Sequence, residues 1–337
     1  MNARPARPRI PLGPGAMMVI VPALAVGALV PSAASAMLVD PIRVGLAFDG
    51  PTDAGFERLA TKGAEAARTA RMATYDIARP ASEGPDPALL DQLAESGHRL
   101  VIAVGFQWAD LVAAAAKRHP GTDFAIVDGS ATTAAAPALP NVRGMLFRED
   151  QAGHLAGYLA ALTARADGRE PVLGAVGGMR IPPVQRYIAG FRAGARAADA
   201  KARVVVHYSG SFLQGVGCGR IARRMVQQGA YAVFSVAGAC GDDAMRASGA
   251  AGRTAIGVDV DQSSMGAYVL TSAIKRVDTA VRDTIADRVS GRFTAGDVRY
   301  GLREGGVGLG RISTAVPADV RAKVNHLARR MGAPARG

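Results

Sequence analysis

From Ile42 to about residue 260, short apolar runs alternate with Ala-rich amphipathic stretches, and this alternation strongly limits the possible folds. Each apolar run has the length of a buried strand, and each amphipathic stretch is long enough for a helix. The predicted strands cover 42–48, 71–77, 100–106, 124–129, 172–178, 203–210, 231–238 and 254–260. The predicted helices cover 53–70, 87–96, 107–118, 150–165, 183–198, 219–228 and 242–250. The pattern predicts an α/β fold with parallel sheets covered by helices on both faces.

The strands form two similar series, 42–129 and 172–260, and a chain of 337 residues is long enough for about two domains. We therefore expect two lobes with a cleft between them. The segment 268–271 follows, and then helices are predicted at 272–290 and 317–331, in a tail that crosses back to the first lobe and returns. The predicted N-terminal lobe comprises 42–140 plus about 270–298, and the C-terminal lobe comprises 141–265 plus about 299–335.

Residues 1–36 have the pattern of a secretory signal peptide. Three arginines (Arg4, Arg7 and Arg9) precede an apolar stretch at 17–30, and Ala34-Ser35-Ala36 gives a small-residue cleavage pattern. The alternative is an N-terminal membrane anchor, although the apolar stretch is short for a span. No Cys stands directly after the stretch, where a bacterial lipid would be attached. We expect an exported, periplasmic or secreted soluble protein after cleavage near Ala36.

Charge and cysteine content narrow the function classes further. The net charge is +12, but the basic residues are scattered singly along predicted helices, so we expect a solvated surface and no nucleic-acid partner. Cys218 and Cys240 are the two cysteines, and in an oxidising compartment an even count permits one disulfide. The alternative is two free buried thiols.

Candidate binding residues follow the predicted strands, because ligands of parallel sheets bind at the carboxyl ends of the strands. The strand-end segments are 49–56, 105–108, 128–129, 177–179, 210–212, 237–241 and 259–262. Phe106 belongs to this set. The sequence lacks GxGxxG, P-loop, GxSxG and HExxH motifs, and its five histidines are isolated. We therefore expect no cofactor, no metal site and no catalytic triad.

Five ordered motifs closely resemble the basic-membrane-protein family of substrate-binding proteins of ABC importers, and the similarity extends over essentially all of 42–335. They are PNVRGMLFREDQAGHLAGYLAALTA (140–164), VGGMRIPPVQRYIAGFRAGA (176–195), AGACG (237–241), IGVDVDQ (256–262) and LTSAIKRVDTAV (270–281). The resemblance implies a two-lobed type I periplasmic-binding-protein fold with three hinge crossovers and no catalysis. It also implies a nucleoside ligand and, in the narrower form of this expectation, a purine nucleoside. The implied partner is an ABC permease in the inner membrane. We expect a monomer.

The resemblance carries over a set of ligand-binding residues one by one. The matching positions in this sequence are Asp49, Phe56, Glu57, Asp128, Phe212, Gly238, Asp259 and Lys275. Phe56 and Phe212 take the aromatic places, where two rings would sandwich a base. Asp259 resembles the acceptor of a ribose diol, and Lys275 would offset the acidic residues around it. The loop that starts at Asp53 ends in Glu57, where the family usually has Asn, and this departure leaves the identity of the base open.

Structural roles remain alternatives for these residues. The two phenylalanines could belong to the core, Asp128 and Asp259 could cap helices, and Lys275 could lie on the surface. Two other functions also use such a cleft: a ligand sensor for a membrane partner, and a nucleoside hydrolase. The hydrolase is disfavoured because the loop after the first strand has only Asp49 and Asp53 before Glu57, rather than a dense acidic cluster.

Overall fold

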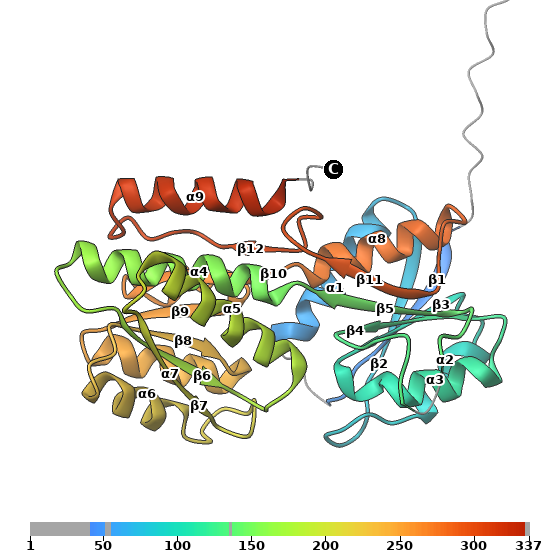
Figure 1. The fold of residues 1–337 in the computed structure, drawn as a ribbon. Coiled ribbons are helices and arrows are strands. Elements are labelled where there is room, and N and C mark those ends of the chain that lie inside the picture. The colour runs from blue at the N-terminus through green and yellow to red at the C-terminus, as the bar shows by residue number, and fades with distance from the viewer. Residues whose placement is uncertain (1–40, 51–54, 135–136, 334–337) are drawn as a thin grey trace, which may run out of the picture. The chain divides into compact units, whose positions relative to one another are not determined.

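The computed structural model describes residues 41–50, 55–134 and 137–333, and Figure 1 shows their arrangement. The predicted signal peptide at 1–36 and Asp53 lie outside these residues. Within them, two six-stranded sheets are flanked by helices, as the alternating pattern predicts. No helix among the described residues has the length and apolar character needed to cross a bilayer.

The first sheet is parallel throughout. Its strands, in spatial order, are β11 (Gly296–Tyr300), β5 (Val142–Phe147), β4 (Asp123–Val127), β3 (Leu100–Val104), β1 (Ile42–Ala47) and β2 (Ala73–Ala78). Alternate residues of β3 enter two separate cores. Ile102 packs on the side of α1 (Gly55–Thr69) and α8 (Val277–Val289), whereas Val101 packs on the side of α2 (Ala88–Glu95) and α3 (Ala109–Arg118). This two-sided burial explains the continuous apolar run.

The second sheet is parallel except for its last pair. Its strands, in spatial order, are β12 (Val307–Leu309), β10 (Val269–Lys275), β9 (Thr254–Asp259), β8 (Ala232–Val236), β6 (Val172–Gly177) and β7 (Arg203–Tyr208). Helices α4 (Glu149–Ala166) and α5 (Pro182–Ala198) share the large core with one face of this sheet. Helices α6 (Cys218–Gln227) and α7 (Gly238–Ala250) cover the other face.

The chain passes between the two sheets three times. Helix α4 leads from β5 to β6, α8 leads from β10 back to β11, and residues 301–306 lead from β11 to β12. The tail therefore crosses back to the first sheet and returns, as expected. Helix α9 (Ala318–Gly332) then lies along α4 (Figure 1). The limits of the two lobes remain a prediction, and strand pairing assigns β5 to the first sheet and β10 to the second.

The predicted start of a helix at residue 272 is wrong. The segment 272–275 continues β10 instead of starting a helix, and α8 begins only at Val277. Strand β10 pairs with β9 and β12, and this non-local pairing outweighs the local preference of the sequence. Lys275 consequently ends a strand rather than lying on a helix.

Helices α4 and α5 pack closely against each other. A Cβ atom at Gly157 of α4 would lie 2.0 Å from the carbonyl oxygen of Phe191, and one at Gly194 of α5 would lie 1.9 Å from that of His154. Only glycine permits this approach of the two backbones. The two helices are thereby held in direct backbone contact.

Candidate functional site

Lys275 lies at the centre of a buried cluster that joins the two sheets. Its Nζ atom donates to both carboxylate oxygens of Asp128, at 2.8 and 3.0 Å. The same atom forms an ion pair with Oε1 of Glu149 at 3.1 Å. The Lys275 side chain is 3% exposed, and that of Glu149 is 0% exposed. A lysine at the end of the second sheet thus binds a carboxylate at the end of the first.

Asp128 and Asp259 reach this cluster through an unusual backbone conformation. Asp128 follows β4 with a φ angle of 64°, and Asp259 ends β9 with a φ angle of 65°. Residues other than glycine rarely adopt this left-handed region, and aspartate tolerates it better than most. The same turn therefore occurs at the carboxyl ends of two strands, one in each sheet.

Three cluster members were not predicted from the sequence: Glu149, Tyr187 and Arg186. Glu149 is the first residue of α4, and its Oε2 accepts from Nε of Arg186 at 2.7 Å. The Tyr187 hydroxyl donates to Oδ1 of Asp259 at 3.4 Å and lies 3.3 Å from the carbonyl oxygen of Ala273. All three lie in quoted family motifs, but only the packing of α4 and α5 brings them to the strand ends.

The electrostatics of the cluster are strongly coupled. Burial raises the pKa of Asp128 to about 6; the Lys275 charge opposes this shift, and the Glu149 and Asp259 charges add to it. Burial also raises the pKa of Asp259. Burial alone would lower the pKa of Lys275, but the carboxylates of Asp128, Glu149 and Asp259 outweigh it and raise that pKa. Lys275 is therefore a permanent cation among acidic groups.

Aromatic rings surround the same ammonium group. Nζ of Lys275 lies 5.4 Å from the ring centroid of Phe56, 5.3 Å from that of Phe147 and 5.7 Å from that of Tyr187. These distances are within cation–π range. Phe56 is half-buried, so the structure brings it together with Asp128, Asp259 and Lys275.

The second predicted aromatic, Phe212, lies in the loop after β7 and is also half-buried. Gly238 begins α7 with a φ angle of 54°, and a Cβ atom there would lie 3.2 Å from the Cβ of Phe212. The backbone N–H of Cys240 donates to the carbonyl oxygen of Phe212 at 3.1 Å. The absence of a side chain at Gly238 thus leaves room for Phe212. The ligand contact expected of Gly238 stays a prediction.

A disulfide joins Cys218 to Cys240, with a Cα–Cα distance of 5.6 Å, so the predicted pairing is confirmed. It links the first residue of α6 to the first turn of α7. Because Cys240 also holds the Phe212 carbonyl, the disulfide stabilises the loop that carries this aromatic ring.

Asp49, Phe106 and Glu57 lie along the carboxyl edge of the first sheet. Asp49 follows β1, and its carboxylate lies against Gly105, the residue before Phe106. Burial raises the pKa of Asp49. Glu57 lies in the first turn of α1, where its Oε2 accepts from Nη1 of Arg79 at 2.7 Å. Glu57 is therefore half of an ion pair, a partnership that the sequence did not indicate.

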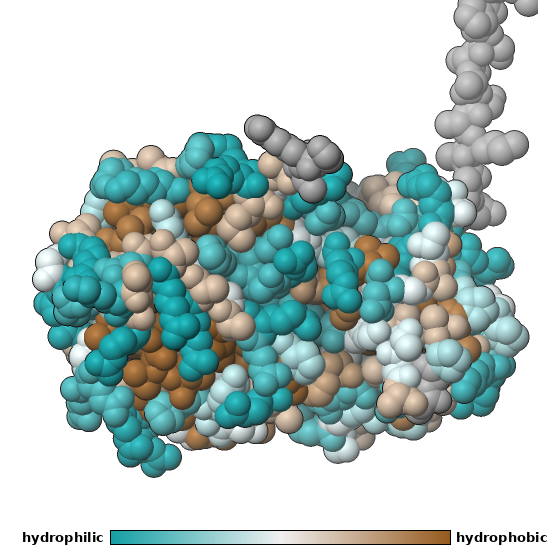
Figure 2. Space-filling view, in the orientation of Figure 1, coloured by the Kyte–Doolittle hydropathy of each residue, from teal (hydrophilic) through white to brown (hydrophobic). Residues whose placement is uncertain are grey.

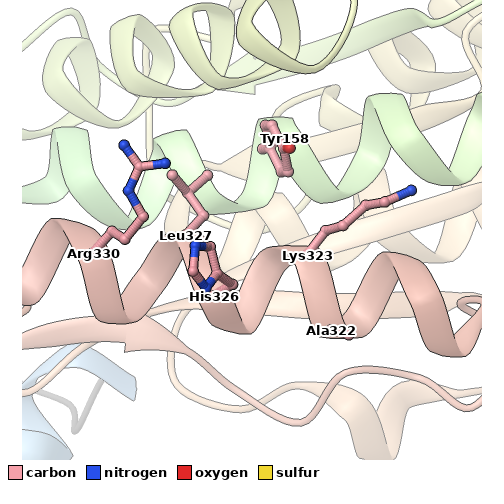
Figure 3. Close-up of a pocket in the computed structure, with 6 residues that line it drawn as sticks. All are labelled: Tyr158, Ala322, Lys323, His326, Leu327 and Arg330. Atoms are coloured by element: carbon pink, nitrogen blue, oxygen red, sulfur yellow. The ribbon is translucent and has the colours of Figure 1, made fainter.

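Two surface depressions lie away from this cluster. One, of about 350 Å³, is lined by Tyr158 of α4 and by α9, from which Lys323 and Arg330 extend toward α4 (Figure 3). The other, of about 560 Å³, lies between α6 and α7. Neither includes a predicted site residue. Hydrophilic residues are spread over the face seen in Figure 2, as expected for scattered charges.

Among the described residues, no group of three or more His, Cys, Asp or Glu side chains is arranged to hold a metal ion. The cluster around Lys275 instead combines carboxylates, one ammonium group and aromatic rings. Such a set can accept hydrogen bonds from hydroxyl groups and stack on a flat ring.

Comparison with known proteins also indicates a substrate-binding protein. The family model described as "ABC transporter substrate-binding protein PnrA-like" matches residues 42–329. An "uncharacterized lipoprotein" of Pyrococcus horikoshii is 32% identical over 281 residues, which span 79% of this chain and 68% of the relative. The "ABC transporter nucleoside-binding protein BmpA" of Lactococcus lactis is 32% identical over 236 residues, 64% of each chain.

A solved structure shares the fold. The chain superposes on an ABC transporter solute-binding protein of Aeropyrum pernix K1 with a TM-score of 0.73 and 27% sequence identity. The match covers 87% of this chain and 91% of that one. The family and this neighbour are substrate-binding proteins rather than enzymes.

Proposed function

Because the chain belongs to the family of PnrA-like ABC transporter substrate-binding proteins, we propose that it binds a purine nucleoside between its two sheets. The observation that carries this proposal is the Lys275 cluster, which joins acidic strand ends of both sheets beside the Phe56 ring. The nucleoside-binding relative from Lactococcus lactis supports the ligand class.

The chemistry of a nucleoside fits these residues. An ionised Asp259 accepts two ribose hydroxyl hydrogens through short, charge-assisted bonds, and Tyr187 orients that carboxylate. Phe56 from the first sheet and Phe212 from the second offer flat surfaces to the two faces of a base. Lys275 and Asp128 together supply donors and acceptors for the remaining polar atoms.

We also propose that the two sheets mark two lobes that close around the ligand. The three passages of the chain between the sheets provide the hinge. A closed state gains the contacts of both lobes, so the ligand shifts the population toward it. An ABC permease in the membrane then distinguishes loaded from empty protein. This function requires export, which the predicted signal peptide at 1–36 would provide, and a monomer suffices for it.

Native mass spectrometry of the purified protein, followed by titration calorimetry with a nucleoside panel, tests the proposal. We expect a retained or added purine nucleoside, much weaker binding of the free base, and recovery of the nucleoside intact after long incubation. Equal affinity for base and nucleoside would remove the role of the ribose. Release of free base would instead indicate a hydrolase.

A further inference from the structure

An ion pair between Glu57 and Arg79 lies at the carboxyl edge of the first sheet. Arg79 directly follows β2, and its Nη1 donates to Oε2 of Glu57 at 2.7 Å and to the carbonyl oxygen of Gly50 at 3.2 Å. Its guanidinium lies over the buried ring of Phe48, 4.4 Å from the centroid. The carboxylate, the carbonyl oxygen and the ring hold the guanidinium in place.

This edge adjoins the proposed ligand site. Glu57 immediately follows Phe56, the ring that lies 5.4 Å from Nζ of Lys275. The segment after Arg79 returns to the site, because the N–H of Gly84 donates to the carbonyl oxygen of Asp49 at 2.8 Å. In the proposed site, a base stacked on Phe56 would lie beside the residue of α1 that holds this ion pair.

The two partners are not equally accessible. The side chain of Glu57 is 5% exposed, whereas that of Arg79 is 22% exposed. A ligand edge at this place would meet the guanidinium rather than the carboxylate. A guanidinium carries only donors, so the approaching edge must offer acceptors. An asparagine at position 57 would offer a donor and an acceptor and would impose no such requirement.

Purines differ in this respect at position 6. A 6-oxopurine presents two neighbouring acceptors, O6 and N7, which match the fork of an arginine. A 6-aminopurine presents the acceptor N7 beside an amino group. The amino group is a donor and would face the donors of Arg79. We propose that Arg79 is a specificity-determining residue that selects 6-oxopurine nucleosides, with Glu57 as its positioning residue. This inference rests on the proposed nucleoside function.

Titration calorimetry of the purified protein with inosine and adenosine tests the inference, since these ligands share the ribose and differ at position 6. We expect the wild-type protein to bind inosine on the order of tenfold more tightly, about 1.4 kcal/mol. Arg79→Ala should reduce this ratio to about threefold or less, and Arg79→Lys, which keeps the charge but loses the fork, should give an intermediate ratio. Arg43→Ala is the matched control, because Arg43 also pairs with an acid, Asp76 of β2, but lies near the amino end of β1 and away from the carboxyl edge of the sheet.

Arg79→Ala leaves the buried carboxylate of Glu57 without this partner and can impair folding. The double variant Arg79→Ala/Glu57→Gln removes both charges and should show the same loss of the inosine preference. A wild-type preference for adenosine, or an unchanged ratio in a folded Arg79 variant, would overturn the inference while nucleoside binding stands. Binding of neither ligand, nor of any other nucleoside, would overturn the proposed function itself.

Discussion

Replacing Lys275 by methionine tests whether the inter-sheet cluster depends on its cation. Methionine keeps much of the apolar stem and removes the ammonium group that lies 2.8 Å from Asp128 and 3.1 Å from Glu149. Both carboxylates are at most 10% exposed, so they would remain buried without the charge that compensates them. Breaking a buried pair in this way costs about 3–5 kcal/mol of unfolding free energy.

The penalty should depend on pH. Asp128 has a pKa of about 6 in the folded protein, above its ordinary value of 3.8, so the folded state takes up a proton more readily than the unfolded state. Its contribution to stability therefore falls as pH rises from about 4 to about 6. Loss of Lys275 raises this folded-state pKa further and extends the window upward. A single proton changes the unfolding free energy by at most about 1.4 kcal/mol per pH unit.

Urea unfolding of the wild-type protein and of Lys275→Met at pH 5 and pH 8 measures both effects. We expect a larger penalty at pH 8, because Asp128 is protonated in both proteins near pH 5. Lys62→Met is the control: Lys62 is 69% exposed and pairs with Asp278, so its loss should cost under about 1 kcal/mol at either pH. The reasoning would be refuted if the two lysine variants lost equal unfolding free energy. It would also be refuted if Lys275→Met lost the same amount at pH 5 and at pH 8.

Three further predictions concern the ligand, the disulfide and the closure of the lobes. Asp259→Ala should weaken nucleoside binding in calorimetry by roughly 1.5–3 kcal/mol, the scale of hydrogen bonds to a charged group, and unchanged affinity would exclude its role as diol acceptor. Replacing Cys218 and Cys240 by serine should lower the unfolding free energy by about 3 kcal/mol and weaken binding through Phe212; unaltered urea midpoints would contradict this. Small-angle scattering should show a smaller radius of gyration with bound nucleoside, whereas an unchanged radius would argue against closure.

The fold could be predicted largely because its inner strands are buried on both faces. Strand β3 is apolar at every position and β8 at every position except Ser235, and that pattern is visible without any tertiary information. The inner strand β5, which contains Arg143, and the short outer strands β11 and β12 were missed. Strand β11 contains Asp297 and Arg299, and β12 has three residues, so neither has a recognisable apolar run. Only pairing with β5 and β10 makes them strands.

The candidate site also contains residues that the sequence predicts and residues that it does not. Asp128, Asp259 and Lys275 stand in recognisable motifs at strand ends, and the structure brings them together. Glu149 and Tyr187 begin helices or lie within them, where an acid or an aromatic ring usually has a local role. Their place in the cluster depends on the close packing of α4 on α5, which the sequence does not reveal. The pairing of Glu57 with Arg79 likewise joins residues 22 positions apart.

The two sheets repeat one another strand by strand, and this repetition explains why two aspartates meet one lysine. Strands β1 to β5 occupy the same places in the first sheet as β6 to β10 in the second. Asp128 and Asp259 are equivalent in this order and share the same backbone turn. The equivalence ends at the neighbouring strand, where Phe147 ends β5 and Lys275 ends β10. The repeated fold thus supplies two aspartate acceptors, Asp128 and Asp259. At the ends of β5 and β10 the two sheets differ, and the first supplies the aromatic ring of Phe147 where the second supplies the cation of Lys275. A ligand with both hydroxyl groups and a flat ring needs this combination, whereas two identical halves would provide only one kind of contact.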